Sequence, residues 1–343
     1  MSTRFMPNPS FVHAFRAAIF TAFAALCSLS SAALQAAPAW SVSRMQSADS
    51  LLLDVTDPNL RQLLVYEDSL ISLGDSLVRG SSYEVREAAC VAFIPMLVRA
   101  LRTPDAFDFP FDRVQTLSVV RAPDQSFRLF TFQMMLWDYT YRYFGAIQYR
   151  DNELRLTPLM DASLFMADSV LNTAVLGPEE WYGAIYYGIT SRKHKGKTFY
   201  FLFGFDGLDL FSSRKLVEVL QFENERPVFG APLFPDKSEE PVFSNRFILE
   251  YKKEASASLN YDKELEQIVF DHLVPENPLS EGIRSTYIPD GTYEGFSWDK
   301  KGHWVYVDKV FTQMQLFAPD YTPESDPSQD PFNYENRSKK RDE

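Results

Sequence analysis

The chain has 343 residues and a formal net charge of −12, from 34 Lys and Arg against 46 Asp and Glu. This acidic balance argues against nucleic acid as a partner, because proteins bind phosphates mainly with Lys and Arg, and it also argues against docking on anionic lipid. The length allows a full hydrophobic core, and the aromatic residues, 15% of the sequence, are placed as is typical of β-strands.

The first 36 residues have the pattern of a secretory signal peptide. Basic residues without acidic neighbours precede an apolar run over residues 17–29, and small residues follow it. The run is shorter than the ~20 apolar residues that a membrane helix requires. We therefore expect cleavage between Ala33 and Ala39, with Ala36 as the favoured last residue. The mature protein is expected to be exported, to the periplasm or out of the cell, without stable insertion in a membrane.

Residues 37–112 are predicted to form a helical section. Asp57 and Pro58 provide an N-cap and a proline at the first helical position. Leucines then recur at helical spacing, and Gly80 is expected to end this first helix.

A second helix is predicted directly after Gly80. Ser81 and Glu84 form a candidate capping box at its start, and Pro95 is expected to kink it. Because the connection is so short, the two helices are expected to pack antiparallel. Cys90, the one cysteine of the mature chain, lies among apolar residues of this helix and is expected to be a buried, unreactive thiol.

From residue 113 to residue 317 the hydrophobic pattern changes to period two, which predicts a β-rich section of the same domain. Phenylalanines alternate over residues 199–205, and the residues between them are also mostly apolar. This strand is therefore expected to lie in the centre of a sheet with both faces covered. Residues 159–181 are expected to form a short helical or irregular insert. Further strands are expected at residues 130–136, 141–149, 216–222, 247–253, 257–261, 267–273, 294–298 and 304–310.

Short strands separated by brief polar turns indicate antiparallel hairpins. The sequence therefore predicts an α+β fold, in which an N-terminal antiparallel helix pair is followed by a largely antiparallel β-meander, arranged as an open barrel or a sandwich. Residues 318–343 contain prolines among acidic residues and then a mostly basic end, which is a composition typical of a disordered tail.

An aromatic residue followed by aspartate marks several predicted turns. The repetition would fit a degenerate propeller repeat, or it reflects the suitability of Asp for tight turns and of aromatic residues for strand ends. The irregular spacing favours the second interpretation. The four instances are Trp137-Asp138, Phe205-Asp206, Tyr261-Asp262 and Trp298-Asp299.

Several segments together resemble a family of uncharacterised exported bacterial proteins. The resemblance covers most of the chain after about residue 80. It implies bacterial export and one integrated unit, and it assigns no activity and no catalytic residue. The segments that carry it include FDFPFD at 107–112, SFRLFTFQ at 126–133, WYGAIYY at 181–187, FGFDG at 203–207 and YIPDGTYEGF at 287–296.

The sequence contains no motif for a metal, a cofactor or a nucleophilic centre. The histidines of the mature chain are His194, His272 and His303, and none of them has the spacing of a zinc ligand set. Neither Gly-x-Gly-x-x-Gly nor Gly-x-Ser-x-Gly occurs. We therefore predict no cofactor and no metal site, and we assign no catalytic residue.

The candidate binding region is the segment 271–304, which gathers aromatic and polar residues around a predicted Pro289-Asp290-Gly291 turn between two strands. Turns carry function more often than the strands that hold them, and Tyr and Trp offer a large contact area with a polar tip. The alternative is that Trp298 and Trp304 pack against each other across a hairpin. The candidate binding residues are His272, Asp290, Tyr293, Trp298 and Trp304.

Two classes of function are compatible with these observations. The first is a non-enzymatic exported protein that binds an envelope protein or a glycan, or assists envelope assembly. The second is a glycan-directed hydrolase with a dispersed carboxylate site. A deep pocket with two carboxylates roughly 5–9 Å apart would favour the hydrolase, whereas a shallow aromatic patch would favour binding.

Overall fold

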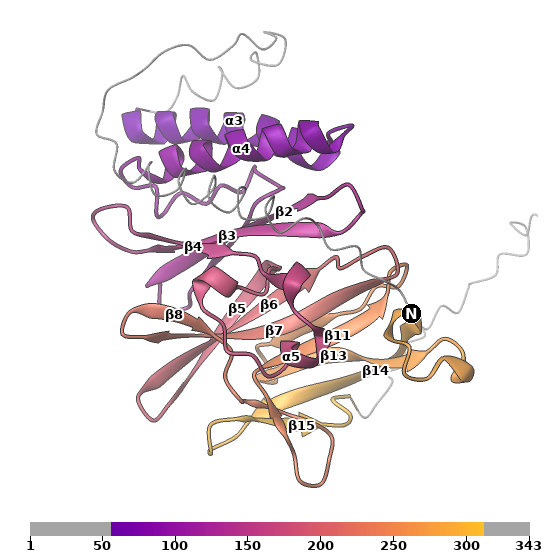
Figure 1. The fold of residues 1–343 in the computed structure, drawn as a ribbon. Helices are drawn as coiled ribbons and strands as arrows, with labels where there is room; N and C mark the ends of the chain where they lie inside the picture. The colour runs from indigo at the N-terminus through magenta and orange to yellow at the C-terminus, as the bar shows by residue number, and fades with distance from the viewer. Residues whose placement is uncertain (1–55, 312–343) are drawn as a thin grey trace, which may run out of the picture. The chain divides into compact units, whose positions relative to one another are not determined.

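The computed structural model describes residues 56–311, in which two long helices precede a series of antiparallel sheets (Figure 1). The predicted α+β class is confirmed, and the described strands form stacked sheets rather than a closed barrel. The predicted signal peptide, residues 1–36, and the predicted tail, residues 318–343, lie outside the described residues. Within residues 56–311, the helices are too short or too polar to span a membrane.

Helices α3 (Pro58–Arg79) and α4 (Tyr83–Leu101) form the predicted pair. The Asp57 carboxylate accepts a hydrogen bond from the first turn of α3, and the backbone N–H of Gly80 closes its last turn. Helix α4 begins one residue later than predicted, because Ser82 rather than Ser81 accepts the hydrogen bond from the Val85 N–H. Cys90 is buried as predicted, and burial raises the pKa of its thiol to about 12.

The first sheet lies directly against the helices. In β2, Phe130, Phe132 and Met134 pack into the core shared with the helices, whereas Phe127 and Leu129 point to the opposite core. This alternation follows from the period of two in a strand. The sheet has the antiparallel order β1 (Ser118–Arg121), β2 (Phe127–Met135), β3 (Tyr141–Tyr149), β4 (Leu156–Met160).

The second sheet confirms the prediction of a central, doubly covered strand. In β6, Tyr200 and Leu202 face the core under the first sheet, and Phe201 and Phe203 face a third core. Its order is β11 (Arg246–Lys252), β7 (Ser212–Glu223), β6 (Lys197–Asp206), β5 (Ile185–His194), and β8 (Arg226–Phe229) also pairs with β7.

The third sheet encloses the third core from its other side. Its order is β12 (Leu259–Asp262), β13 (Gln267–Pro275), β14 (Tyr287–Trp298), β15 (Trp304–Val307), and a two-stranded sheet of β9 (Phe234–Pro235) and β10 (Phe243–Ser244) lies beside it. The remaining elements are η2 (Ser163–Phe165), α5 (Asp168–Leu171), η3 (Pro178–Glu180), η4 (Pro278–Ser280) and η5 (Arg284–Thr286).

The helix layer and the three sheets are thus stacked on three successive hydrophobic cores. The predicted insert at 159–181 contains the end of β4 and the short helices η2, α5 and η3, as Figure 1 shows in part. The predicted aromatic–aspartate turns have a local cause: the carboxylates of Asp138, Asp262 and Asp299 accept hydrogen bonds from backbone N–H groups of the residues that follow. This supports the turn interpretation of the pattern.

Candidate functional site

The predicted binding region is built on an irregularity in the third sheet. Between the pairs Asp271–Tyr293 and Leu273–Pro289, the register of β13 and β14 shifts, so that residues 290–292 lie opposite the single residue His272. The Asp290 carboxylate stabilises this bulge by accepting hydrogen bonds from the N–H and the hydroxyl of Thr292. The Pro289-Asp290-Gly291 segment was predicted to be a turn between strands. That prediction is wrong, because the segment is a bulge inside β14.

The bulge places His272 between two carboxylates. Its Nδ1 lies 2.8 Å from Asp290 Oδ2, and its Nε2 lies 3.7 Å from Glu294 Oε1. The buried Glu294 also accepts hydrogen bonds from Lys237 Nζ and from the Tyr306 hydroxyl, each over 2.6 Å. We call these five residues the His272 cluster.

The hydrogen bonds of the His272 cluster favour the ionised form of Asp290 and the neutral form of Tyr306. Desolvation opposes the ionisation of Asp290, but the hydrogen bonds from Thr292 and His272 outweigh it and lower the pKa of Asp290 to about 2. Burial and the hydrogen bond to Glu294 raise the pKa of Tyr306 well above its ordinary value. Because the imidazole of His272 fills the space between the two carboxylates, a glycosidic bond has no room there.

The tryptophans of the predicted region lie apart from the His272 cluster, further along β14. Trp298 and Trp304 are cross-strand partners with ring centroids 5.1 Å apart, and Trp304 is 0% exposed against Phe201. The packing alternative therefore describes this pair. Tyr293 lies opposite Asp271 in the sheet and is partly exposed.

A second candidate surface lies on two loops that were predicted only as turns. The loop between β2 and β3 exposes Trp137 and Tyr139, and 67% of the Trp137 surface is accessible. The Asp138 carboxylate accepts hydrogen bonds from the N–H and the hydroxyl of Thr140, and Tyr139 has a positive φ of 64°. The loop is therefore held in a defined conformation with its aromatic rings outside.

The loop between β6 and β7 exposes Leu210 and Phe211, and Phe211 is 70% accessible. The Asp209 carboxylate accepts hydrogen bonds from the N–H groups of Phe211 and Ser212, so this tip is fixed in the same way. We call Trp137, Tyr139, Leu210 and Phe211 the aromatic loop pair.

The two loops touch each other through Tyr141. Its ring lies so close to Gly207 that a Cβ at that position would come within 2.7 Å of a ring carbon. Lys253 Nζ donates to the Gly207 carbonyl over 2.5 Å and lies 5.2 Å from the centroid of the Tyr141 ring. These contacts hold the two loops of the aromatic loop pair against each other.

A buried polar network anchors the second loop from below. The Asp206 carboxylate accepts hydrogen bonds from the hydroxyls of Tyr143 and Tyr182 and from the N–H of Leu208, each over 2.8 Å. The Tyr143 hydroxyl in turn accepts from the Gly207 N–H over 2.7 Å. Burial and the charge of Asp206 raise the pKa values of both tyrosines well above the ordinary value. Since these groups satisfy one another, the network rigidifies the loop.

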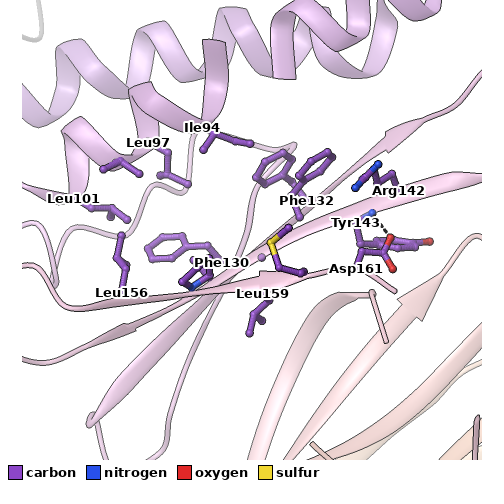
Figure 2. A pocket seen from close by; sticks show the side chains of 16 residues that line it. Ile94, Leu97, Leu101, Phe130, Phe132, Arg142, Tyr143, Leu156, Leu159 and Asp161 are labelled. Carbon is purple, nitrogen blue, oxygen red and sulfur yellow. Dashed lines mark hydrogen bonds between the residues drawn. The ribbon is translucent and has the colours of Figure 1, made fainter. Parts of the chain in front are cut away.

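A small cavity lies elsewhere, between α4 and strands β3 and β4 (Figure 2). It encloses about 40 Å³, and its walls are mostly apolar. Asp161 is the one carboxylate in its lining. Burial raises the pKa of Asp161 to about 6, against hydrogen bonds from Ser163 and Tyr143. This cavity therefore lacks the carboxylate pair that glycoside hydrolysis requires.

The sequence predicted part of these two sites. It identified His272 and Asp290, and the structure brings them together. It missed Glu294, Lys237 and Tyr306. Lys237 lies in a polar loop far from β14 in the sequence, and no sequence pattern predicts its contact with Glu294. Trp137 belongs to one of the aromatic–aspartate turns. That pattern predicted the position of the loop, but it did not predict that the Trp137 side chain is exposed.

Comparison with known proteins adds no functional residue. The function is therefore inferred from the geometry of the aromatic loop pair and of the His272 cluster. The resemblance to exported bacterial proteins stays a prediction. No family model matches this sequence, and no curated protein matches it.

Proposed function

We propose that this protein is an exported, non-enzymatic binding or envelope-assembly protein that holds its partner against the aromatic loop pair. The observation that carries the proposal is the exposure of Trp137, Tyr139, Leu210 and Phe211 on two adjoining loops. Large aromatic side chains contribute most of the energy in many interfaces. Monomeric proteins rarely expose such residues together without a partner.

The rigidity of the loops supports this role. Each tip is fixed by hydrogen bonds to an aspartate, Asp138 or Asp209, and the second loop rests on the buried Asp206 network. Loops that already have their bound conformation lose little conformational entropy on association. Aromatic residues on such loops suit either a protein surface or the apolar face of a sugar, so the partner is an envelope protein or a glycan.

The hydrolase alternative has less support. Glycoside hydrolysis needs two carboxylates on either side of a bound sugar. In the His272 cluster the imidazole lies between Asp290 and Glu294, and the cavity beside α4 is lined by one carboxylate. The His272 cluster is better suited to fixing the bulge of β14 beside the partly exposed Tyr293 than to catalysis.

The proposal is tested by retention of partners from the envelope fraction and by a glycan array. The double variant Trp137→Ala/Phe211→Ala should lose a partner that the wild-type protein retains, while its melting temperature changes little, because both side chains are exposed. A matched control is Leu279→Ala, which removes an apolar side chain that is 92% exposed on a different element. Equal retention by the wild type, the double variant and the control would refute the proposed surface.

A further inference from the structure

Two hairpin turns that are far apart in the sequence meet where the second sheet packs on the third. Gly302, in the turn between β14 and β15, lies so close to the ring of His194 that a Cβ at position 302 would overlap with the imidazole. His194 is the last residue of β5, directly before the turn that leads into β6. The turns at residues 195–196 and 299–303 are therefore neighbours in space.

These two turns gather lysines in a chain whose formal net charge is −12. Lys195 lies in the first turn and Lys197 begins β6, and Lys300 and Lys301 lie in the second turn; all four are exposed. Lys197 Nζ is 4.0 Å from a carboxylate oxygen of Glu223. Within residues 56–311, the other three lysines have no ion-pair partner. We call the four lysines the lysine turn pair.

The one carboxylate within the two turns holds the backbone and not a lysine. Asp299 Oδ1 accepts hydrogen bonds from the backbone N–H groups of residues 301–303, and Asp299 Oδ2 lies 3.5 Å from His303 Nδ1. These bonds fix the conformation of the second turn. In the first turn, Lys195 has a positive φ of 47°, which is typical of a tight two-residue hairpin. The lysines therefore project from backbones of defined conformation.

The basic surface is bounded by acidic residues. A third turn, residues 263–266, lies at the same end of the third sheet, because Gln267 directly after it pairs with Ser297, close to the second turn. This third turn carries one lysine and two glutamates, and the Glu266 carbonyl accepts from Arg192 Nη2 over 3.4 Å. Exposed charges act over about 8 Å at physiological ionic strength. A planar anionic surface or a broad duplex would meet these glutamates, whereas a single thin chain can contact the lysine turn pair alone.

We propose that the lysine turn pair binds a linear polysaccharide that carries sulfate or phosphate groups. Short runs rich in Lys and Arg, such as RKHKGK at 192–197, are typical of surfaces that bind such polysaccharides or nucleic acids, and the net charge of the chain disfavours nucleic acid. Lysine ammonium groups are point charges on flexible stems, so they follow the anionic groups of a flexible chain. The site is independent of the aromatic loop pair, because Lys197 begins β6 and the loop with Leu210 and Phe211 follows its end.

Titration calorimetry of the mature protein with low-molecular-weight heparin, a sulfated linear polysaccharide, tests the proposal. The wild type should bind heparin saturably, and the affinity should fall as the NaCl concentration rises, because binding releases counterions. Neutral dextran should not bind, and a short DNA duplex and phosphatidylglycerol vesicles should bind more weakly than heparin. Absence of saturable heparin binding, or equal affinity for the duplex or the vesicles, would overturn the proposal.

Substitution of the three lysines without an ion-pair partner locates the site. The triple variant Lys195→Gln/Lys300→Gln/Lys301→Gln should weaken heparin binding about tenfold, because it removes three exposed ion pairs that are individually weak. Its melting temperature should stay close to that of the wild type, since the side chains are exposed. Lys195→Gln alone and Lys300→Gln/Lys301→Gln should each weaken binding by part of this amount. A loss confined to one of the two turns would contradict a joint site.

The matched control has the same change in net charge at a distant surface. Arg79→Gln/Arg99→Gln/Arg102→Gln removes three positive charges from exposed positions at the ends of α3 and α4. This variant should bind heparin with nearly the wild-type affinity. Equal weakening in the lysine and arginine variants would show that the net charge, and not the lysine turn pair, determines binding.

Discussion

Three oxygen atoms surround the buried guanidinium of Arg128. Its Nη1 and Nη2 donate to the carbonyls of Phe109 and Ala106, each over 2.6 Å, and its Nε donates to Gln148 Oε1 over 2.8 Å. Burial, and to a smaller extent the charge of the nearby Arg121, lowers the pKa of Arg128 to about 9. The side chain thus ties the segment after α4 to the first sheet through hydrogen bonds to neutral groups.

Arg128→Met should lower the free energy of unfolding by about 3 kcal/mol or more, because it leaves buried carbonyl oxygens without donors. Urea unfolding followed by circular dichroism measures the change. Arg155→Met, at a side chain that is half exposed, should change it by less than about 0.5 kcal/mol. Equal effects of the two substitutions would contradict the anchoring role of Arg128.

The carboxylate of Asp290 links stability to pH. Its pKa of about 2 in the folded protein is below the ordinary value, so the native state favours the ionised form. The stabilisation is fully present above the pKa of the unfolded chain, and it is lost as the pH falls towards about 2. In Asp290→Asn the melting temperature should therefore fall less steeply between about pH 4 and pH 2 than in the wild type.

Thermal melts over this pH range provide the measurement for Asp290. Asp151→Asn, at an exposed position outside the His272 cluster, is the control and should follow the wild-type curve. If the melting temperature of Asp290→Asn falls with pH as steeply as that of the wild type, the bulge of β14 does not depend on this ionised carboxylate.

At the scale of the elements, the contact between the β2–β3 loop and the β6–β7 loop depends on the absence of a side chain at Gly207. Gly207→Ala should push the Tyr141 ring away, because the new Cβ would lie 2.7 Å from it. Overpacking of this kind costs ~1–3 kcal/mol. It should also weaken partner binding without removing any residue of the aromatic loop pair.

Urea unfolding and partner retention together check the Gly207→Ala prediction. Gly188→Ala in β5 is the matched control, since a Cβ there would meet its nearest neighbour at an ordinary 3.6 Å. If Gly207→Ala behaves like Gly188→Ala in both measurements, the two loops do not support each other.

Elements with strong local signals were predicted well from the sequence. Helix α3 begins at Asp57-Pro58 and ends at Gly80. Both ends are set by hydrogen bonds between residues close in the sequence, so a local pattern predicts them. By contrast, no bounds were predicted for β5, because its residues are mostly half-buried and show no clean alternation. Its place is fixed by its pairing with β6 over almost the whole length of both strands. The bulge at His272 likewise depends on a register shift between β13 and β14 that no local pattern reveals.

At the scale of the whole molecule, the helix layer shares a core with the first sheet. The ring of Phe93 in α4 lies 4.9 Å from that of Phe132 in β2, measured between centroids. The sequence predicted a helix pair on antiparallel strands. It did not predict the stacking of the three sheets, because β7 pairs with the distant β11 and the cores join side chains far apart in the chain.

This shared core predicts that the helices and sheets unfold together. Phe93→Ala should lower the free energy of unfolding by ~3–5 kcal/mol. During unfolding of this variant, the helical circular dichroism signal and the tryptophan fluorescence should change in one coincident transition. The tryptophans among the described residues lie in the sheets and their loops, so fluorescence reports on that part. A helical signal lost well before the fluorescence changes would show that the helix layer is a separate unit.

The central claim, that the aromatic loop pair meets a partner in the cell envelope, is tested most directly by photo-cross-linking in cells. The residue p-benzoylphenylalanine is placed at position 211 in one strain and at position 279 in another, since both Phe211 and Leu279 are largely exposed. We expect a discrete cross-linked product at position 211, absent at position 279 and lost when Trp137→Ala is added. No product at position 211, or the same product at both positions, would contradict the claim.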